Sequence, residues 1–150
     1  TLKEIIEHLL SQRLFYDTHK PILLKLSPDL DEAQVDEIVD LVLSCGLDGI
    51  VACNTTNSRD KLTTNQSVID AIGNGGLSGA PLFERTLERV KYIYEKTEGK
   101  LPIIASGGVM TPIQAQQLLE AGASLVEVYT GFIYNGPSFA KKIINHLKKC

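Results

Sequence analysis

Residues 102–112 read PIIASGGVMTP, a short apolar run that ends in two consecutive glycines and leads into a helix start. The segment Ile103–Ala105 has the length and composition of a buried strand. Adjacent glycines at the carboxyl end of a strand let the backbone come very close to another group. Thr111 and Gln114 form a capping-box pattern, and Pro112 takes the first helical position. The stretch therefore predicts a strand, a glycine turn and a helix in immediate succession.

The same alternation of strand and helix runs along the whole chain. The expected strands cover residues 22–27, 49–53, 103–105 and 125–130. The expected helices cover about 2–14, 31–45, 82–97, 112 to the stop at Gly122, and 139–147. Asp31 is the expected N-cap of the second helix, and Gly46 its expected end. A polar loop is expected from the second strand to about Gly79.

Apolar strands that alternate with amphipathic helices predict an α/β fold with a parallel sheet covered by helices. Four βα units are half of a (β/α)8 TIM barrel, whose usual length is about 250 residues. A half-barrel has two open sheet edges, so we expect it to be unstable alone or to pair with another half. An open doubly wound sheet is the alternative, although no GxGxxG motif follows any strand.

Composition narrows the functional classes. The chain has 150 residues, of which 43% are hydrophobic, as is usual for one folded domain. A net charge of −3 without a long basic run argues against nucleic acid as a partner. We find neither an apolar stretch near the roughly 20 residues of a membrane-spanning helix nor a signal-peptide pattern.

Because Thr1 is not Met, a fragment or processed product is expected. Cys45, Cys53 and Cys150 lack metal-site spacing, so no metal site is predicted.

The carboxyl ends of the strands are where βα barrels place their active sites. Those ends supply one cation, small polar residues and glycines: Lys25, residues 53–56, residues 106–108 and residues 129–131. We expect no histidine or carboxylate close to them, a composition that suits ligand binding more than acid–base chemistry. The three histidines, His8, His19 and His146, are expected to be solvated.

The glycines predict a phosphate site. Barrels frequently bind phosphate through the loops after strands seven and eight, using glycine amides. Gly107, Gly108 and residues 129–131 occupy those loops if this is the second half of a barrel; a plain chain turn is the alternative. Lys25, inside an apolar strand, must find a partner, either an anionic ligand or an acid from a segment outside this chain. Cys53 has no residue spaced to activate it, so a buried inert thiol is expected.

Two further segments carry polar groups that suit a ligand. Asn54 and Thr55 both donate and accept hydrogen bonds, as a planar ligand with carbonyls and N–H groups requires. The alternative is a turn in which these side chains bond their own backbone. Ser78, in the glycine-rich loop 75–82, is placed either to cap the following helix or to bind a ligand.

Five motifs occur in order: KLSPDL at 25–30, NTT at 54–56, GGLSGAPL at 75–82, PIIASGGV at 102–109 and AGASLVEVYTGFIYNGP at 121–137. Together they resemble the C-terminal half of class 2 dihydroorotate dehydrogenases, the FMN-containing, quinone-linked enzymes of pyrimidine biosynthesis. The resemblance covers nearly the whole chain from about Pro21. It implies that residues 1–150 are the C-terminal part of a single FMN-binding barrel domain whose N-terminal half is absent from this chain.

The resemblance also implies roles for ten residues. Lys25 would lie beside the pyrimidine edge of the flavin, where a cation stabilises developing negative charge. Asn54 and Thr55 would bind the dihydroorotate ring. The remaining implied FMN contacts are Cys53, Ser78, Gly79, Gly107, Gly108, Tyr129 and Thr130, with Gly108, Tyr129 and Thr130 around the phosphate. Cys53 stands where relatives often have Thr, and so brings no hydroxyl to that contact.

The resemblance places other parts of the enzyme outside this chain. In this family the catalytic base is a serine in the first half of the barrel, so no catalytic residue is predicted here and the chain alone is expected to be inactive. The intact protein would convert dihydroorotate to orotate with quinone as acceptor, attached peripherally to the cytoplasmic side of the membrane if bacterial. The alternatives are a class 1 or other FMN barrel oxidoreductase with a soluble acceptor, and a non-catalytic half-barrel that binds a phosphorylated ligand.

Overall fold

A four-stranded parallel sheet forms the centre of the computed structural model, which describes residues 1–60 and 62–149. Its strands are β1 (Leu23–Leu26), β2 (Gly49–Ala52), β3 (Ile103–Ser106) and β4 (Leu125–Glu127), in the order β1-β2-β3-β4. Strand order follows chain order throughout, whereas a doubly wound sheet reverses direction at a switch point. The structure therefore confirms the α/β half-barrel and not the doubly wound alternative.

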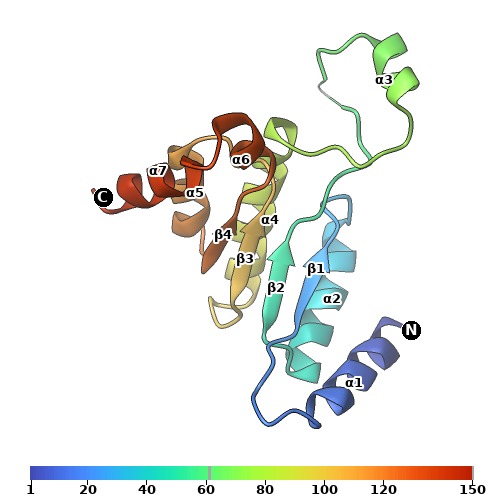
Figure 1. The fold of residues 1–150 in the computed structure, drawn as a ribbon. Helices are drawn as coiled ribbons and strands as arrows, with labels where there is room; N and C mark the ends of the chain where they lie inside the picture. Colours follow the sequence, from blue (N-terminus) through green and yellow to red (C-terminus); the bar gives the residue numbers. More distant parts are fainter. Residues whose placement is uncertain (61, 150) are drawn as a thin grey trace.

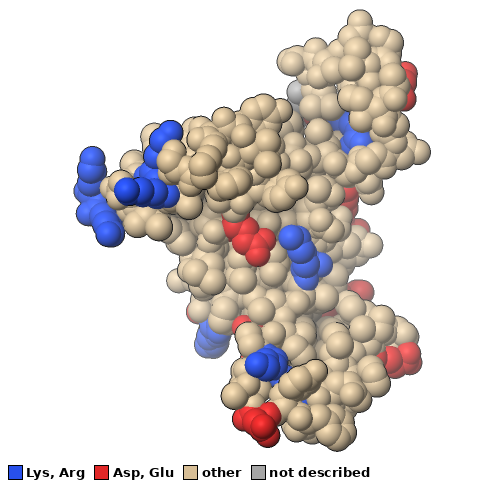
Figure 2. All heavy atoms as spheres, in the orientation of Figure 1, with Lys and Arg blue, Asp and Glu red and all other residues tan. Residues whose placement is uncertain are grey.

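Helices precede, connect and follow the strands of this sheet. They are α1 (Leu2–Arg13), α2 (Glu32–Cys45), α3 (Gln66–Ile72), α4 (Phe83–Lys96), α5 (Pro112–Glu120), α6 (Thr130–Asn135) and α7 (Phe139–Leu147), with a 3-10 turn η1 (Ala80–Leu82) before α4. Figure 1 shows α2 and α4 behind the sheet and no helix across its front. Few charged side chains lie over that front face (Figure 2). Among the described helices, none combines the length and the apolar character needed to cross a bilayer.

The core lies between the sheet and the helices behind it. Val35, Val39 and Val42 of α2 are fully buried, as the helical spacing predicts. They face a sheet layer that includes Ile50 and Ile103, both also fully buried. The strands pair in parallel with Leu26 beside Ala52 and Ala52 beside Ala105, so their carboxyl ends lie at the same edge of the sheet.

The predicted helix ends are confirmed. Asp31 accepts a hydrogen bond from the Gln34 amide at 2.8 Å, and Gly46 ends α2 with a φ of 69°. Thr111 caps α5 in the same reciprocal way, with Pro112 at the first helical position. Tyr94 of α4 is 43% exposed. Its ring lies over Gly122, where an added Cβ would come within 2.1 Å of Tyr94.

Two short helices, α3 and α6, were not expected from the sequence. α3 interrupts the expected polar loop; Asn65 caps it, and none of its residues is buried. α6 begins at Thr130, inside the expected strand 125–130, so β4 ends earlier, at Glu127. Both helices are too short to show a helical repeat of apolar residues, which is the main signal for a helix in a sequence.

Residues 57–76 form an excursion between β2 and α4, which we call the arm. Figure 1 shows the arm, with α3 at its tip, projecting away from the rest of the molecule. Thr56 and Leu77 close its base through an antiparallel bridge with N–O distances of 3.0 and 2.8 Å.

Candidate functional site

A cavity of about 470 Å³ opens at the carboxyl edge of the sheet. It is lined by residues at or just after the carboxyl ends of all four strands, together with the turn before η1. All ten residues for which the sequence predicts ligand contacts lie in this lining: Lys25, Cys53, Asn54, Thr55, Ser78, Gly79, Gly107, Gly108, Tyr129 and Thr130. The fold thus brings together residues that are spread over more than 100 positions of the chain.

The segment after β2 is tied to both neighbouring strands. The Cys53 amide donates to the Ser106 carbonyl at 2.7 Å, and the Asn54 amide donates to the Leu26 carbonyl at 2.7 Å. The Asn54 side-chain oxygen accepts from the Thr55 amide at 2.9 Å, which is the local turn bond that the sequence left open as an alternative. Both side chains are nevertheless exposed and line the cavity.

Cys53 is buried against this cavity, with 2% of its surface exposed. Burial raises the pKa of its thiol to about 11, so the group stays protonated at neutral pH. A protonated thiol is a poor nucleophile and no base. The peptide bond between Ala52 and Cys53 is cis.

Glycines let the turns at the cavity pack without side chains. Gly107 and Gly108 have φ values of 121° and 82°, which favour glycine. A Cβ on Gly108 would lie 2.3 Å from the Phe83 backbone nitrogen at the start of α4. A Cβ on Gly131 would lie 2.0 Å from the Val109 carbonyl oxygen. The turns after β3 and β4 and the start of α4 are therefore in direct contact.

This glycine turn also presents hydrogen-bond donors. Among the backbone hydrogen bonds of the described residues, none uses the amide of Gly107 or Gly108. The hydroxyls of Ser78 and Thr130 lie 3.1 Å apart and add two further polar groups. Ser78, Gly107, Gly108 and Thr130 all line the one cavity, and backbone amides with hydroxyls are the kind of donor set that binds phosphate. The residues present therefore fit a phosphorylated ligand.

Lys25 meets a carboxylate of this chain, a contact that was not expected from the sequence. Its ammonium group lies 3.8 Å from a carboxylate oxygen of Glu127, and both side chains are about half exposed. β1 and β4 are opposite edge strands, about 14 Å apart along a flat sheet, so this ion pair crosses the front face. A half-exposed pair contributes about 0–1 kcal/mol, which leaves Lys25 available to an anionic ligand.

Glu127 also corrects the expectation that no carboxylate lies near the strand ends. It is the last residue of β4 and lines the cavity. Reasoning from the sequence missed this position because the expected strand covered residues 125–130, which placed Glu127 inside the strand and not at its end. An acidic residue between apolar neighbours in LVEVY was the available signal.

The histidines lie away from the cavity. His8 and His19 are exposed, as expected, although His19 also contacts Asp48 at 2.6 Å. His146 is partly buried and contacts Gln116 at 2.7 Å, so the expectation of a solvated ring is wrong for His146. Within residues 1–60 and 62–149, no three His, Cys, Asp or Glu side chains lie close enough together to hold a metal ion. Cys150 lies outside the described residues.

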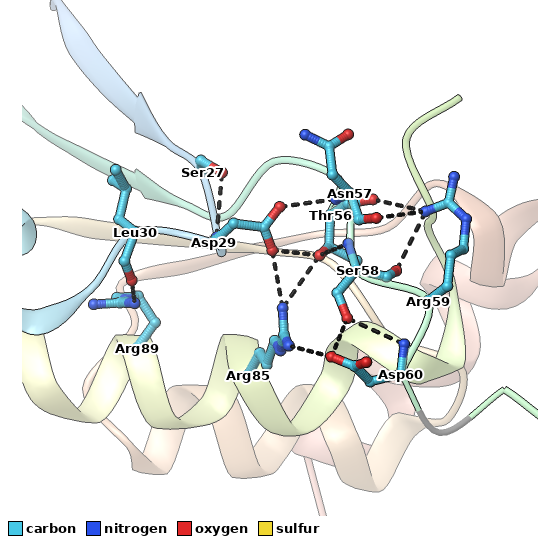
Figure 3. Close-up of polar contacts among 10 residues, drawn as sticks. All are labelled: Ser27, Asp29, Leu30, Thr56, Asn57, Ser58, Arg59, Asp60, Arg85 and Arg89. Carbon is cyan, nitrogen blue, oxygen red and sulfur yellow. Dashed lines mark hydrogen bonds and ion pairs between the residues drawn. The ribbon is translucent and has the colours of Figure 1, made fainter. Parts of the chain in front are cut away.

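One polar cluster beside the cavity was missed by reasoning from the sequence. Asp29, just beyond β1, bonds the segment after β2 and also pairs with Arg85 of α4 (Figure 3). Arg89, one turn further along α4, donates to the Leu30 carbonyl at 2.6 Å. The signal available in the sequence was Asp29 within the motif KLSPDL, directly after a strand.

Comparisons with known proteins match the chain along its whole length. The family model described as dihydroorotate dehydrogenase matches residues 2–150. The dihydroorotate dehydrogenase (quinone) of Nocardia farcinica is 48% identical over 82% of this chain, and that of Kineococcus radiotolerans 46% identical over 86%. The corresponding protein of Trichodesmium erythraeum is 41% identical over 99%. The chain spans 33–40% of the length of these relatives.

Solved structures give the same result. Ligand-free DHODH from Eimeria tenella superposes with a TM-score of 0.88 at 34% identity, covering 97% of this chain and 44% of that one. DHODH from the same organism in complex with ferulenol also gives a TM-score of 0.88, at 33% identity, and covers 97% and 43%. This chain therefore has the fold of somewhat less than half of those proteins.

Proposed function

The chain belongs to the dihydroorotate dehydrogenase family, and we propose that it is the C-terminal half of an FMN-dependent, quinone-linked enzyme that oxidises dihydroorotate to orotate in pyrimidine biosynthesis. The observation that carries the proposal is that all ten expected ligand-contact residues, eight from the ends of the four strands and two from the turn before η1, line one cavity. In this proposal residues 1–150 belong to a single barrel domain. The other half of the barrel completes the cavity and supplies the catalytic base.

The cavity suits FMN at two points. The amides of Gly107 and Gly108, with the hydroxyls of Ser78 and Thr130, line the cavity and would bind the phosphate. Lys25 would stabilise negative charge at the edge of the ring system. When bound, FMN supplies the two-electron redox chemistry. Cys53 would contribute only packing, because its buried thiol stays protonated.

Asn54 and Thr55 are the proposed substrate contacts. Both line the same cavity as Lys25, and both stand on a segment that is tied to β1 and β3 by backbone hydrogen bonds. An amide and a hydroxyl can match the carbonyl and N–H groups of the dihydroorotate ring. Their task would be to orient that ring toward the cofactor, since neither group acts as a base at neutral pH.

The quinone and the membrane contact belong to the part of the enzyme outside this chain. The three relatives above are all named as quinone-linked, which supports quinone over a soluble acceptor. We place the protein on the cytoplasmic side of the membrane, peripherally attached, if it is bacterial. A non-catalytic half-barrel that binds a phosphorylated ligand is the competing function.

Anaerobic bleaching of the flavin tests the proposal. The chain as given, and a version extended upstream to its natural start, are each mixed with FMN and then with dihydroorotate. We expect only the extended protein to hold FMN and to lose its visible absorbance. Reoxidation by a soluble quinone, compared with fumarate or NAD+, then identifies the acceptor. Bleaching by the 150-residue chain alone contradicts placing the base elsewhere, and no response from the extended protein contradicts the function.

A further inference from the structure

Asp29 joins three parts of the molecule beside the cavity without lining it. Its Oδ1 accepts hydrogen bonds from the Thr56 hydroxyl and from Nη1 of Arg85, the latter at 2.9 Å. Its Oδ2 accepts from the Asn57 amide at 2.8 Å. Figure 3 shows the carboxylate between the segment after β2 and the helix α4. One side chain thus connects the end of β1, the end of β2 and α4.

Thr56 is the residue that this network holds most firmly. Only 4% of it is exposed, and its hydroxyl accepts from the Ser58 amide at 3.0 Å while it donates to Asp29. Arg85 adds a contact of 3.2 Å to the same hydroxyl. The Thr56 backbone is also paired with Leu77 at the base of the arm. Because the hydroxyl and the backbone are both bonded, Thr56 has almost no freedom to move.

The two proposed substrate contacts lie between Thr56 and a second fixed point. Asn54 is held on its other side by the bond from its amide to the Leu26 carbonyl. Thr55 packs against Gly76, where an added Cβ would come within 2.1 Å of the Thr55 hydroxyl. A two-residue span with both ends fixed has little conformational freedom, and release of the Thr56 end would free both side chains.

We propose that Asp29 is a positioning residue, which holds residues 54–57 through Thr56, Asn57 and Arg85 so that Asn54 and Thr55 face the substrate. That the ligand is dihydroorotate rests on the proposed function. That Asp29 holds residues 54–57 in place does not depend on it. A hydrogen bond to a charged acceptor is about twice as strong as one between neutral groups. The Thr56 hydroxyl and the Asn57 amide are uncharged donors, so a carboxylate at position 29 binds them more strongly than a neutral amide side chain would. The carboxylate, rather than the shape of the side chain, therefore carries the effect.

Asp29→Asn is the informative variant, and the chain offers a matched control. Asp48 has a similar set of donors, with an arginine and a backbone amide, but lies at the opposite edge of the sheet. In the extended, FMN-loaded protein, we expect Asp29→Asn to raise the dissociation constant for orotate about 10-fold. Asp48→Asn should change it by less than about 2-fold. Orotate binding is read from the change that it causes in the flavin spectrum.

Amide hydrogen exchange gives a second readout that needs no substrate. In Asp29→Asn, the amides of Asn57 and Ser58 should exchange at least about 10-fold faster, because their acceptors are lost or displaced. In Asp48→Asn the Ile22 amide should respond instead, since it donates to Asp48 at 2.7 Å. Thr56→Val removes the hydroxyl and should reproduce Asp29→Asn, whereas Thr56→Ser keeps the hydroxyl and should restore slow exchange. The Thr56 pair also tests the proposal if Asp29→Asn does not fold.

Each outcome has a distinct meaning. Unchanged exchange of the Asn57 and Ser58 amides in Asp29→Asn overturns the proposal, and so does faster exchange with unaltered orotate affinity. An equal loss of orotate affinity in Asp48→Asn would also overturn it, because the effect would then be general loosening. If the unmodified protein binds FMN but not orotate, the proposed function fails, while the exchange data still decide whether Asp29 fixes the segment.

Discussion

The parallel strands begin at one edge of the sheet, the amino edge, and end at the other, the carboxyl edge. Each of these two edges has an aspartate that accepts hydrogen bonds from three donors, and the two aspartates differ in which segments they hold. Asp29, at the carboxyl edge, holds the segment beside the cavity. Asp48, at the amino edge directly before β2, accepts from Arg13 and from the Ile22 amide, each at 2.7 Å, and contacts His19 at 2.6 Å. The side chains are similarly exposed, at 28% and 24%.

Similar chemistry therefore serves two purposes. Asp48 ties α1 and the connection after it to the start of β2, where no cavity-lining residue lies. Asp29 ties down a segment that lines the cavity on one side and begins the arm on the other. Barrel folds separate stability at one end from activity at the other, and the two aspartates lie at those two ends of the half-barrel.

Glycine replacement at each edge gives the largest expected effect. Gly108→Ala places a Cβ 2.3 Å from the Phe83 backbone at a φ of 82°, whereas Gly49→Ala places one 2.6 Å from the Pro102 carbonyl oxygen. Each should lower the free energy of unfolding by about 2–4 kcal/mol, measured by urea denaturation. Only Gly108→Ala should also weaken FMN binding in the extended protein. Equal loss of FMN from both variants would break the comparison between the edges.

Removal of the charge at the amino edge should affect stability alone. Asp48→Asn weakens the bonds from Arg13 and Ile22, and a lost hydrogen bond to a charged group costs about 1.5–3 kcal/mol. We expect the free energy of unfolding to fall by about 2 kcal/mol, with FMN affinity unchanged. Urea denaturation and FMN titration of the same sample measure both quantities. Weaker FMN binding in this variant would show that the two edges are not independent.

Acid should weaken both edges in the same direction. The hydroxyl of Thr56 lowers the pKa of Asp29, and the backbone amide of Ile22 lowers that of Asp48. Each carboxylate is therefore ionised more readily in the folded than in the unfolded chain, where its pKa is about 3.9. The resulting stability is present above that pH and is lost as the pH falls through the folded-state values.

The measurement is the free energy of unfolding at about pH 6 and about pH 3.5, in the original protein and in the double variant Asp29→Asn, Asp48→Asn. The original protein should lose more stability on acidification than the double variant, because only its two carboxylates are ionised more readily in the folded state. The same loss in both proteins would contradict this assignment of the acid sensitivity.

The smallest expected effect is a difference in the rate at which two thiols, one near each edge, react with a thiol reagent. Cys45 ends α2 near the amino edge and is partly exposed, whereas Cys53 is buried at the carboxyl edge. With a pKa of about 11, about one Cys53 thiol in a thousand is ionised at pH 8. A thiol reagent should therefore modify Cys45 first, with Cys53 at least about 100-fold slower. Peptide mass spectrometry distinguishes these sites from Cys150. Comparable rates would show that the cavity opens to reagent.

The helix ends were predicted well from the sequence, because the residues that form each of them are close together in the chain. Asp31, Gly46 and Thr111 each act at a helix end through bonds to residues at most four positions away, so a short motif contains all the information. Likewise, the strand ends that line the cavity follow from four apolar runs and the general rule for barrels.

Features that depend on distant residues were not predicted. The pairing of Lys25 with Glu127 joins opposite edge strands, and Asp29 meets Arg85 across 56 positions of the chain. Neither contact leaves a periodic pattern, because each needs the sheet to be assembled first. The helices α3 and α6 were not predicted for a different reason. One or two turns of helix contain too few residues to define a buried face.

The arm has a consequence for the entropy of closing the sheet. β1 pairs with β2 across 26 positions, from Leu23 to Gly49, and β3 with β4 across 21, from Ile104 to Leu125. The arm makes the β2–β3 separation 53 positions, from Ile50 to Ile103. Loop-closure entropy grows only with the logarithm of length, so this doubling costs about 0.6 kcal/mol. An insertion that carries a whole extra helix is therefore nearly neutral for the sheet, and the length of the arm is free to vary without altering the strand register.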